Sequence, residues 1–170
     1  MASLVEELVT VLEEEEKIYQ LFYEYGVEKT DVLIRADIPN LERLTALEQE
    51  ASDRLLSLTN KQMSILKDIS TVLGKTDEQL TVTRIAELMA TQPEVRDKII
   101  TARDRLMDTA AKVQTLNQQN EVLIQQAIEL AEFDITLFKS MRQAPETANY
   151  DKNAYNTGTL LGSSGFDAKQ

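Results

Sequence analysis

The residue types that carry most chemistry at neutral pH are missing from this chain. Its 170 residues include no His, no Cys and no Trp. Without His and Cys the chain cannot build a Ser–His–Asp or Cys–His triad, a thiolate nucleophile, or a zinc site with imidazole or thiolate ligands. The di-iron site of some four-helix bundles needs a Glu-x-x-His pattern, which is also absent. We therefore expect no enzymatic activity, no metal and no cofactor.

Among the ionisable groups that remain, carboxylates form a cluster at Glu13 to Glu16. The cluster could be a carboxylate metal site or the solvated face of a helix. Around the cluster, residues spaced alternately by four and three form a seam, the line along one helix face that packs against other helices. These residues are Leu4, Leu8, Val11, Glu15, Ile18, Phe22 and Tyr25. Only Glu15 falls on that seam. We interpret the cluster as an outer helix face plus one seam position.

The charge of the chain disfavours several classes of partner. The formal net charge is -11, and such a surface repels phosphate backbones, so nucleic acid and anionic membranes are poor partners. No stretch approaches 18 consecutive apolar residues, so we expect no membrane insertion. The N-terminal residues lack the basic start and apolar run of a signal peptide. These observations predict a cytoplasmic location.

Two long helices are predicted in the first half of the chain. Ser3 can cap the first helix in a capping box, and Gly26 should not interrupt it, because one Gly costs only about 1 kcal/mol in a helix. Asp37 can cap the second helix, with Pro39 in its first turn, and Gly74 can end it. Each helix is about 50 Å long. The very short turn between them predicts an antiparallel hairpin.

A short helix and a third long one are predicted in the second half. Thr81 to Met89 has one apolar side, and Pro93 opens a helix that extends to about Arg142. Its seam repeats every 3.5 residues: Val95, Ile99, Ala102, Leu106, Thr109, Val113, Leu116, Asn120, Leu123, Ala127, Leu130, Asp134, Leu137 and Met141. A buried Asn120 would fix the register of the bundle, whereas a buried Asp134 would be costly, so the seam should drift there.

The sequence thus predicts an all-α fold, an elongated antiparallel bundle of three long helices plus one short helix. The helical domain spans residues 1–142, and a flexible C-terminal tail spans residues 143–170. The tail is rich in Gly, Asn, Ser and Thr and shows no sustained period. Its Tyr155 and Phe166 are side chains of a kind that can fold onto a partner, although a loose terminus with incidental aromatic residues explains them as well.

The last third of the long helix gives the clearest sign of a partner. Its apolar residues exceed one face, which indicates more than one contact: Leu123, Ile124, Ala127, Ile128, Leu130, Ala131, Phe133, Leu137 and Phe138. This helix should be about 25 Å longer than either hairpin helix, and an apolar end without a facing helix would leave surface exposed. Whether the short helix or a bend covers that excess is left open.

At this point the chain resembles the FlgN-type flagellar export chaperones. A long acidic first helix leads into Arg35 to Leu41, which is similar to the family's entry to its second helix. Leu44 to Glu50 resembles the family's Leu-x-x-x-Glu pattern, and Asn120 to Ile124 its Asn-x-x-Leu-Ile pattern. Ala154 to Gly158 resembles its Tyr-x-x-Gly element in a C-terminal tail.

The resemblance implies a cytoplasmic chaperone of flagellar type III export, which binds C-terminal helical segments of the hook–filament junction proteins FlgK and FlgL. Export apparatus components are further partners, and weak self-association is left open. With the resemblance, we expect the client-binding residues to be Leu123, Ile124, Ala127, Leu130, Ala131, Leu137, Tyr155 and Phe166. The alternative is a structural or adaptor coiled-coil protein that self-associates through its long helices.

Overall fold

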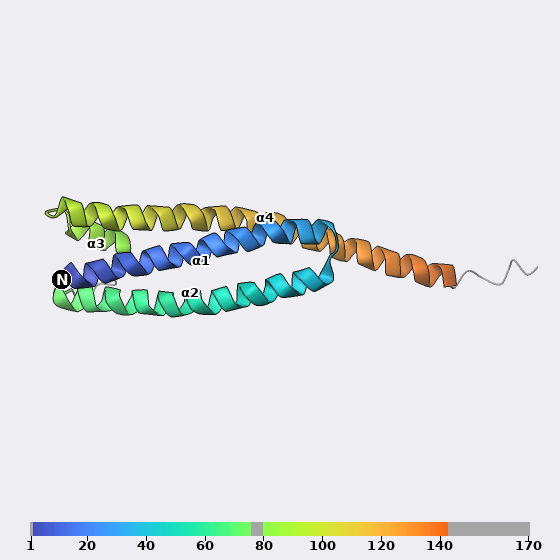
Figure 1. Cartoon of the computed structure of the whole chain (residues 1–170), viewed down its shortest axis with the longest axis horizontal. Coiled ribbons are helices and arrows are strands. Elements are labelled where there is room, and N and C mark those ends of the chain that lie inside the picture. Colours follow the sequence, from blue (N-terminus) through green and yellow to red (C-terminus); the bar gives the residue numbers. More distant parts are fainter. Residues whose placement is uncertain (1, 76–79, 143–170) are drawn as a thin grey trace, which may run out of the picture. The chain divides into compact units, whose positions relative to one another are not determined.

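The computed structural model describes residues 2–75 and 80–142, and these residues are 91% helical without any strand. The helices are α1 (Ala2–Ile34), α2 (Ile38–Val72), α3 (Val82–Leu88) and α4 (Pro93–Arg142) (Figure 1). The all-α prediction is confirmed. The chain divides into two compact units, Met1–Ile128 and Glu129–Gln170, which we describe separately. The predicted tail, residues 143–170, lies outside the described residues.

In the turn between α1 and α2, a motif that ends α1 is followed directly by the N-cap of α2. Ala36 has φ 52°, in the left-handed region. The N–H of Asp37 donates to the Val32 oxygen at 3.0 Å and that of Ala36 to the Leu33 oxygen at 3.1 Å, which is a Schellman ending. Asp37 then caps α2, because its side chain accepts from the Asn40 N–H at 3.2 Å. The predicted cap at Asp37 is confirmed.

Other predicted boundaries agree with the structure, with one exception. Gly74 has φ 66° and lies just past the end of α2, where the N–H of Lys75 donates to the Ser70 oxygen at 2.9 Å. Thr81 caps α3 by accepting from the Arg84 N–H. The cap predicted at Ser3 is wrong, since α1 already begins at Ala2 and Ser3 lies within its first turn.

Within the first unit, α1 and α2 form the predicted antiparallel hairpin. Ion pairs join early α1 to late α2, as in Glu7–Lys61 at 3.5 Å, and late α1 to early α2, as in Glu28–Arg43. Figure 1 shows α1 beside both α2 and α4, with α3 at the end of the unit where α1 begins. Because α3 returns the chain to that end, α4 runs parallel to α1.

The main core lies at the end of the first unit that contains α3. Its fully buried side chains come from all four helices and include Leu8, Leu12, Ile69, Ile85 and Ile99. The seam predicted for α4 is confirmed over this unit, because its buried residues are Ile99, Ala102, Val113 and Asn120. Burial of this kind contributes roughly 1.5–3 kcal/mol for each large side chain.

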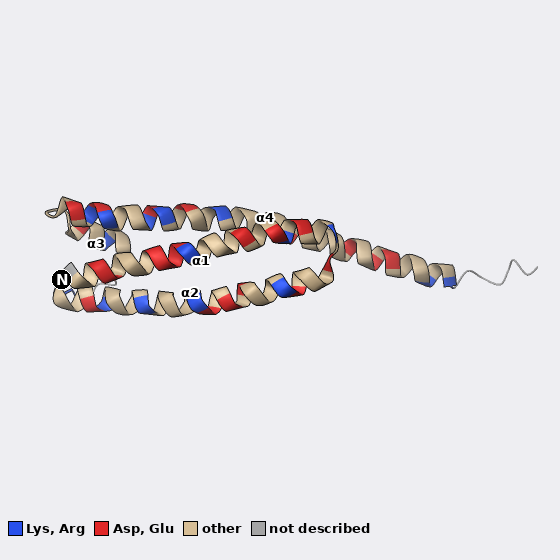
Figure 2. Ribbon diagram, in the orientation of Figure 1, with Lys and Arg blue, Asp and Glu red and all other residues tan. Residues whose placement is uncertain are grey.

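Charged side chains occupy the outer faces of the helices. Figure 2 shows acidic and basic segments interleaved along α2 and the first half of α4. In the acidic cluster of α1, Glu13 and Glu14 are exposed, Glu16 is half-buried and Glu15 is 4% exposed. One seam position among solvated neighbours is what the sequence predicted.

Candidate partner-binding surface

The second unit contains a helix segment, Glu129–Arg142, whose described side chains are all exposed. Leu130, Phe133, Leu137 and Met141 recur after three, four and four residues, so they share one face of the helix. Leu130 and Phe133 are each 62% exposed, and Met141 is 66% exposed. Exposed apolar side chains gathered on one face mark interaction sites far more often than scattered ones do.

A second group of apolar side chains lies beside this face. Ala131, Ile135 and Phe138 are again spaced by four and three residues, and Phe138 is 65% exposed. Asp134 is exposed and lies between the two groups, so the costly burial of its carboxylate does not arise. The polar residues of the opposite face follow at similar spacing: Glu129, Glu132, Thr136, Lys139 and Ser140. The segment therefore offers a broad apolar surface with one polar side.

The six predicted client-binding residues on α4 are divided between the two units, three in each. Leu123 is half-buried, whereas Ile124 and Ala127 are exposed. Leu130, Ala131 and Leu137 are exposed in the second unit. Tyr155 and Phe166 lie outside the described residues. The six residues on α4 stay a predicted client surface, of which Leu123 is the least accessible.

Four exposed apolar side chains of the segment Glu129–Arg142 were not in the predicted client-binding set: Phe133, Ile135, Phe138 and Met141. The sequence already placed Phe133, Phe138 and Met141 among the apolar residues of this helix, and only Ile135 was missed, although it follows Ala131 by four residues on the same face. Met is a common residue at adaptable binding surfaces, since its thioether chain is flexible and polarisable.

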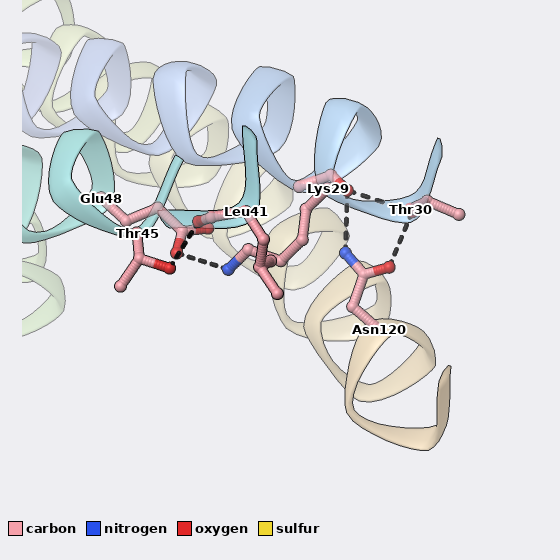
Figure 3. A network of polar contacts seen from close by, with 7 residues as sticks. Lys29, Thr30, Leu41, Thr45, Glu48 and Asn120 are labelled. Atoms are coloured by element: carbon pink, nitrogen blue, oxygen red, sulfur yellow. Dashed lines mark hydrogen bonds and ion pairs between the residues drawn. The ribbon is translucent and has the colours of Figure 1, made fainter. Parts of the chain in front are cut away.

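A polar contact fixes the position of α4 against α1 in the first unit (Figure 3). Asn120 is 2% exposed, and its Nδ2 donates to the Gly26 main-chain oxygen at 2.8 Å. Thr30 Oγ1 donates to Asn120 Oδ1 at 2.7 Å. The amide thus has partners on both sides, as a buried polar group requires. The prediction that Asn120 serves the register of the bundle agrees with this geometry.

The absence of a side chain at Gly26 allows this contact. A Cβ added there would lie 2.8 Å from Leu116 Cδ2 and 3.2 Å from Leu116 Cγ. The two helices therefore approach more closely at this level than a larger residue would permit. Nearby, Lys29 forms an ion pair with Glu48 and links α1 to α2, as Figure 3 also shows.

Two buried or capping carboxylates have shifted pKa values. Burial raises the pKa of Glu15 above its ordinary value, and the hydrogen bond from Thr59 Oγ1 at 3.3 Å opposes that shift only in part. The side-chain hydrogen bond from Asn40 lowers the pKa of Asp37, aided by the Asn40 N–H. Burial in the packed bundle explains the raised pKa of Glu15, and capping of α2 explains the lowered pKa of Asp37.

No metal-binding arrangement is found in the part of the chain that the structure describes. Within residues 2–75 and 80–142, no three acidic side chains gather in a way that could hold a metal ion. No helix among these residues is long and apolar enough to cross a membrane. The apolar surface of α4 is therefore the feature that most needs a functional explanation.

The comparison with protein families identifies the chain. The FlgN protein family matches residues 1–158. The chain belongs to the FlgN family. Membership gives it the general role of a flagellar export chaperone and a place in a family that is not known for enzymes. Comparisons with curated proteins and with solved structures give no match.

In a chain of the FlgN family, the exposed apolar surface of α4 is a candidate site for partner binding. An export chaperone must cover apolar parts of another protein, and therefore needs apolar surface of its own that remains accessible. FlgN proteins act on flagellar export substrates in general. The segment Glu129–Arg142 offers such a surface on a helix that needs no rearrangement to expose it.

Proposed function

We propose that this FlgN-family chain is a cytoplasmic chaperone that holds the hook–filament junction proteins FlgK and FlgL before export. It binds their C-terminal helical segments and keeps them soluble and unassembled. The observation that carries this proposal is the exposed apolar surface of α4, represented by Leu130, Phe133 and Leu137, in a chain of this family. After loading, the chaperone delivers its client to components of the export apparatus.

Helix packing is the mode of binding that the surface supports. An amphipathic client helix can lay its apolar side on Leu130, Leu137 and their neighbours, with anchors spaced by three and four residues. The polar side of the α4 segment then stays in water. The acidic surface, with net charge -11, supports solubility of the complex while it carries an aggregation-prone partner.

The residues after Arg142 complete the proposed site. Tyr155 and Phe166 supply aromatic side chains, which are frequent anchors of protein interfaces. Ordering such a segment on a client costs roughly 2–5 kcal/mol of the interaction energy, which keeps the affinity moderate and permits release. The further members of the proposed client-binding set are Leu123, Ile124 and Ala127 in the first unit and Ala131 in the second.

Isothermal titration calorimetry with synthetic C-terminal segments of FlgK and FlgL tests the proposal. The double substitution Leu130→Glu/Leu137→Glu should weaken binding at least tenfold, because each new glutamate places a charge in the apolar contact. Thr136→Glu adds the same charge on the polar side of the same helix, and serves as the matched control. Equal losses in both variants would contradict the proposed face.

Removal of residues 143–170 tests the contribution of the C-terminal residues. The truncated chain should keep its helical circular dichroism signal and bind the same segments more weakly. Equal affinity of the full and truncated chains would exclude a role for Tyr155 and Phe166. Sedimentation velocity distinguishes the alternative function, since a stable homodimer without affinity for the segments indicates a structural coiled-coil protein.

A further inference from the structure

The first unit has a groove between α2 and α4 whose floor is α1. Its volume is about 500 Å³. The apolar side chains that line it are Tyr19, Phe22, Leu55, Val113 and Ile124. The rings of Tyr19 and Phe22 pack edge to face with their centroids 6.0 Å apart, so the floor of the groove presents two aromatic side chains in contact with each other. Half-buried aromatic side chains in an open groove are typical of interaction sites.

This groove continues the inner face of the bundle beyond α3. Leu8 and Tyr19 are eleven residues apart, or about three helical turns, so they lie on the same face of α1. The first stretch of that face packs in one core with Ile85 of α3. Since α3 ends at Leu88, after 7 residues, it covers only the beginning of the face. The residues of α3 pack into the core that the three long helices share, so this end of the unit accommodates a fourth helix.

The polar rim restricts what the groove can receive. On the side of α2, Glu48 is already paired with Lys29. On the side of α4, Glu121 is exposed and lines the groove, next to the uncharged Asn117. Beyond the Lys29–Glu48 pair, the charge that the groove offers is therefore negative, in a chain of net charge -11. A partner with a basic side chain on its flank matches this rim.

We propose that the groove receives one amphipathic helix of an export client, in line with α3 and between α2 and α4. The helix places apolar residues, spaced by three and four, on Tyr19, Phe22 and Leu55, and a Lys or Arg near Glu121. This inference rests on the proposed function, and it adds a second contact area on the bundle itself. Ile124 lines the groove and also belongs to the predicted client-binding set.

Substitutions at exposed groove residues test this inference without disturbing the core. Ser52→Trp fills the groove from α2, and Ser57→Trp is the matched control because Ser57 is exposed and lines a different face of the hairpin. Glu121→Lys reverses the rim charge, and Asp108→Lys makes the same change at an exposed position of α4 outside the groove. Circular dichroism and thermal unfolding should show that all four variants keep the helical fold.

Calorimetry with the synthetic C-terminal segments of FlgK and FlgL reads out binding to each full-length variant. We expect Ser52→Trp to weaken binding at least tenfold and Glu121→Lys several-fold, while the two controls stay within about twofold of the wild type. Wild-type affinity in both groove variants, with loss only in Leu130→Glu/Leu137→Glu, would overturn the groove and leave the proposed function intact. A wild-type chain that binds neither segment would instead contradict the proposed function. If Ser52→Trp changes self-association in sedimentation but not segment binding, a second copy occupies the groove and the inference is wrong.

Discussion

The side-chain amide of Asn120 donates to the main-chain oxygen of Gly26 at 2.8 Å, across 94 residues of sequence. This hydrogen bond joins α4 to α1 beside the groove that Asn120 helps to line, at a level where a Cβ on residue 26 would crowd the side chain of Leu116. Buried polar contacts of this kind specify register, since any sliding of the helices leaves the amide without partners. The contact therefore fixes the register of α4 against α1 within the first unit.

Removal of the Asn120 amide should destabilise the first unit. Asn120→Ala removes the hydrogen bond from Asn120 Nδ2 to the Gly26 oxygen and the one from Thr30 Oγ1 to Asn120 Oδ1, and leaves the Thr30 hydroxyl only the Gly26 oxygen at 3.1 Å. The free energy of unfolding should therefore fall by about 1–3 kcal/mol. Urea denaturation followed by circular dichroism measures the change. Asn117→Ala, at an exposed position one turn earlier, should change stability by less than about 0.5 kcal/mol. Similar values for both variants would show that the amide does not fix the helices.

A side chain at position 26 should force α1 and α4 apart. Gly26→Val places methyl groups where Leu116 now packs, and overpacking of this kind costs about 1–3 kcal/mol in unfolding free energy. The cost should fall by at least half when Leu116→Ala is already present, because the smaller residue opens the space. A double-mutant cycle in urea measures this coupling. Strictly additive effects of the two substitutions would argue against the close approach.

The left-handed residue between α1 and α2 gives a stabilising substitution. Ala36 has φ 52°, and non-glycine residues in this region cost roughly 1–2 kcal/mol. Ala36→Gly should therefore raise the free energy of unfolding by about 0.5–1 kcal/mol. Gly74→Ala makes the opposite change at φ 66° and should lower it by about 1 kcal/mol, with nothing near the added Cβ. A change of the unfolding free energy in the same direction for both variants would disagree with the left-handed conformation of residues 36 and 74.

Burial of Glu15 should make stability depend on pH. The raised pKa means that the folded chain holds this proton more tightly than the unfolded chain. Stability from this group is therefore greatest below the unfolded pKa, about 4.3, and is lost as pH rises through the folded pKa. Glu15→Gln keeps an acceptor for Thr59 without the charge, and should raise the melting temperature by a few degrees at pH 7. The advantage should vanish near pH 4, and an equal gain at both pH values would exclude the buried charge as its cause.

Local sequence signals predicted most of the fold, because they act over a few residues. Asp37 and Thr81 have side chains that cap a helix, and Gly74 lacks a Cβ and so adopts the positive φ that ends one; the structure uses each residue in that way. The left-handed Ala36 could not be predicted, since alanine has no preference for that conformation and only the turn imposes it. Ser3 was misplaced because a capping residue can also lie inside the first turn.

Contacts between distant residues were less accessible to prediction. Asn120 was recognised from its place on the seam, but its partner Gly26 was considered only as a possible break in α1. The crowding by Leu116 depends on the register of two helices, which no local pattern supplies. The groove was missed for the same reason, because its lining joins Phe22, Leu55 and Val113 from three helices.

The central claim, that the apolar surface of α4 binds client helices, is tested most directly by the heat-capacity change of binding. Titration calorimetry of the full chain with the FlgK C-terminal segment, repeated at several temperatures, gives this quantity. We expect saturable binding with a negative heat-capacity change, since apolar area leaves water. The change should be smaller in magnitude for Leu130→Glu/Leu137→Glu. Binding whose heat-capacity change is near zero, or is unaffected by these two substitutions, would contradict the account.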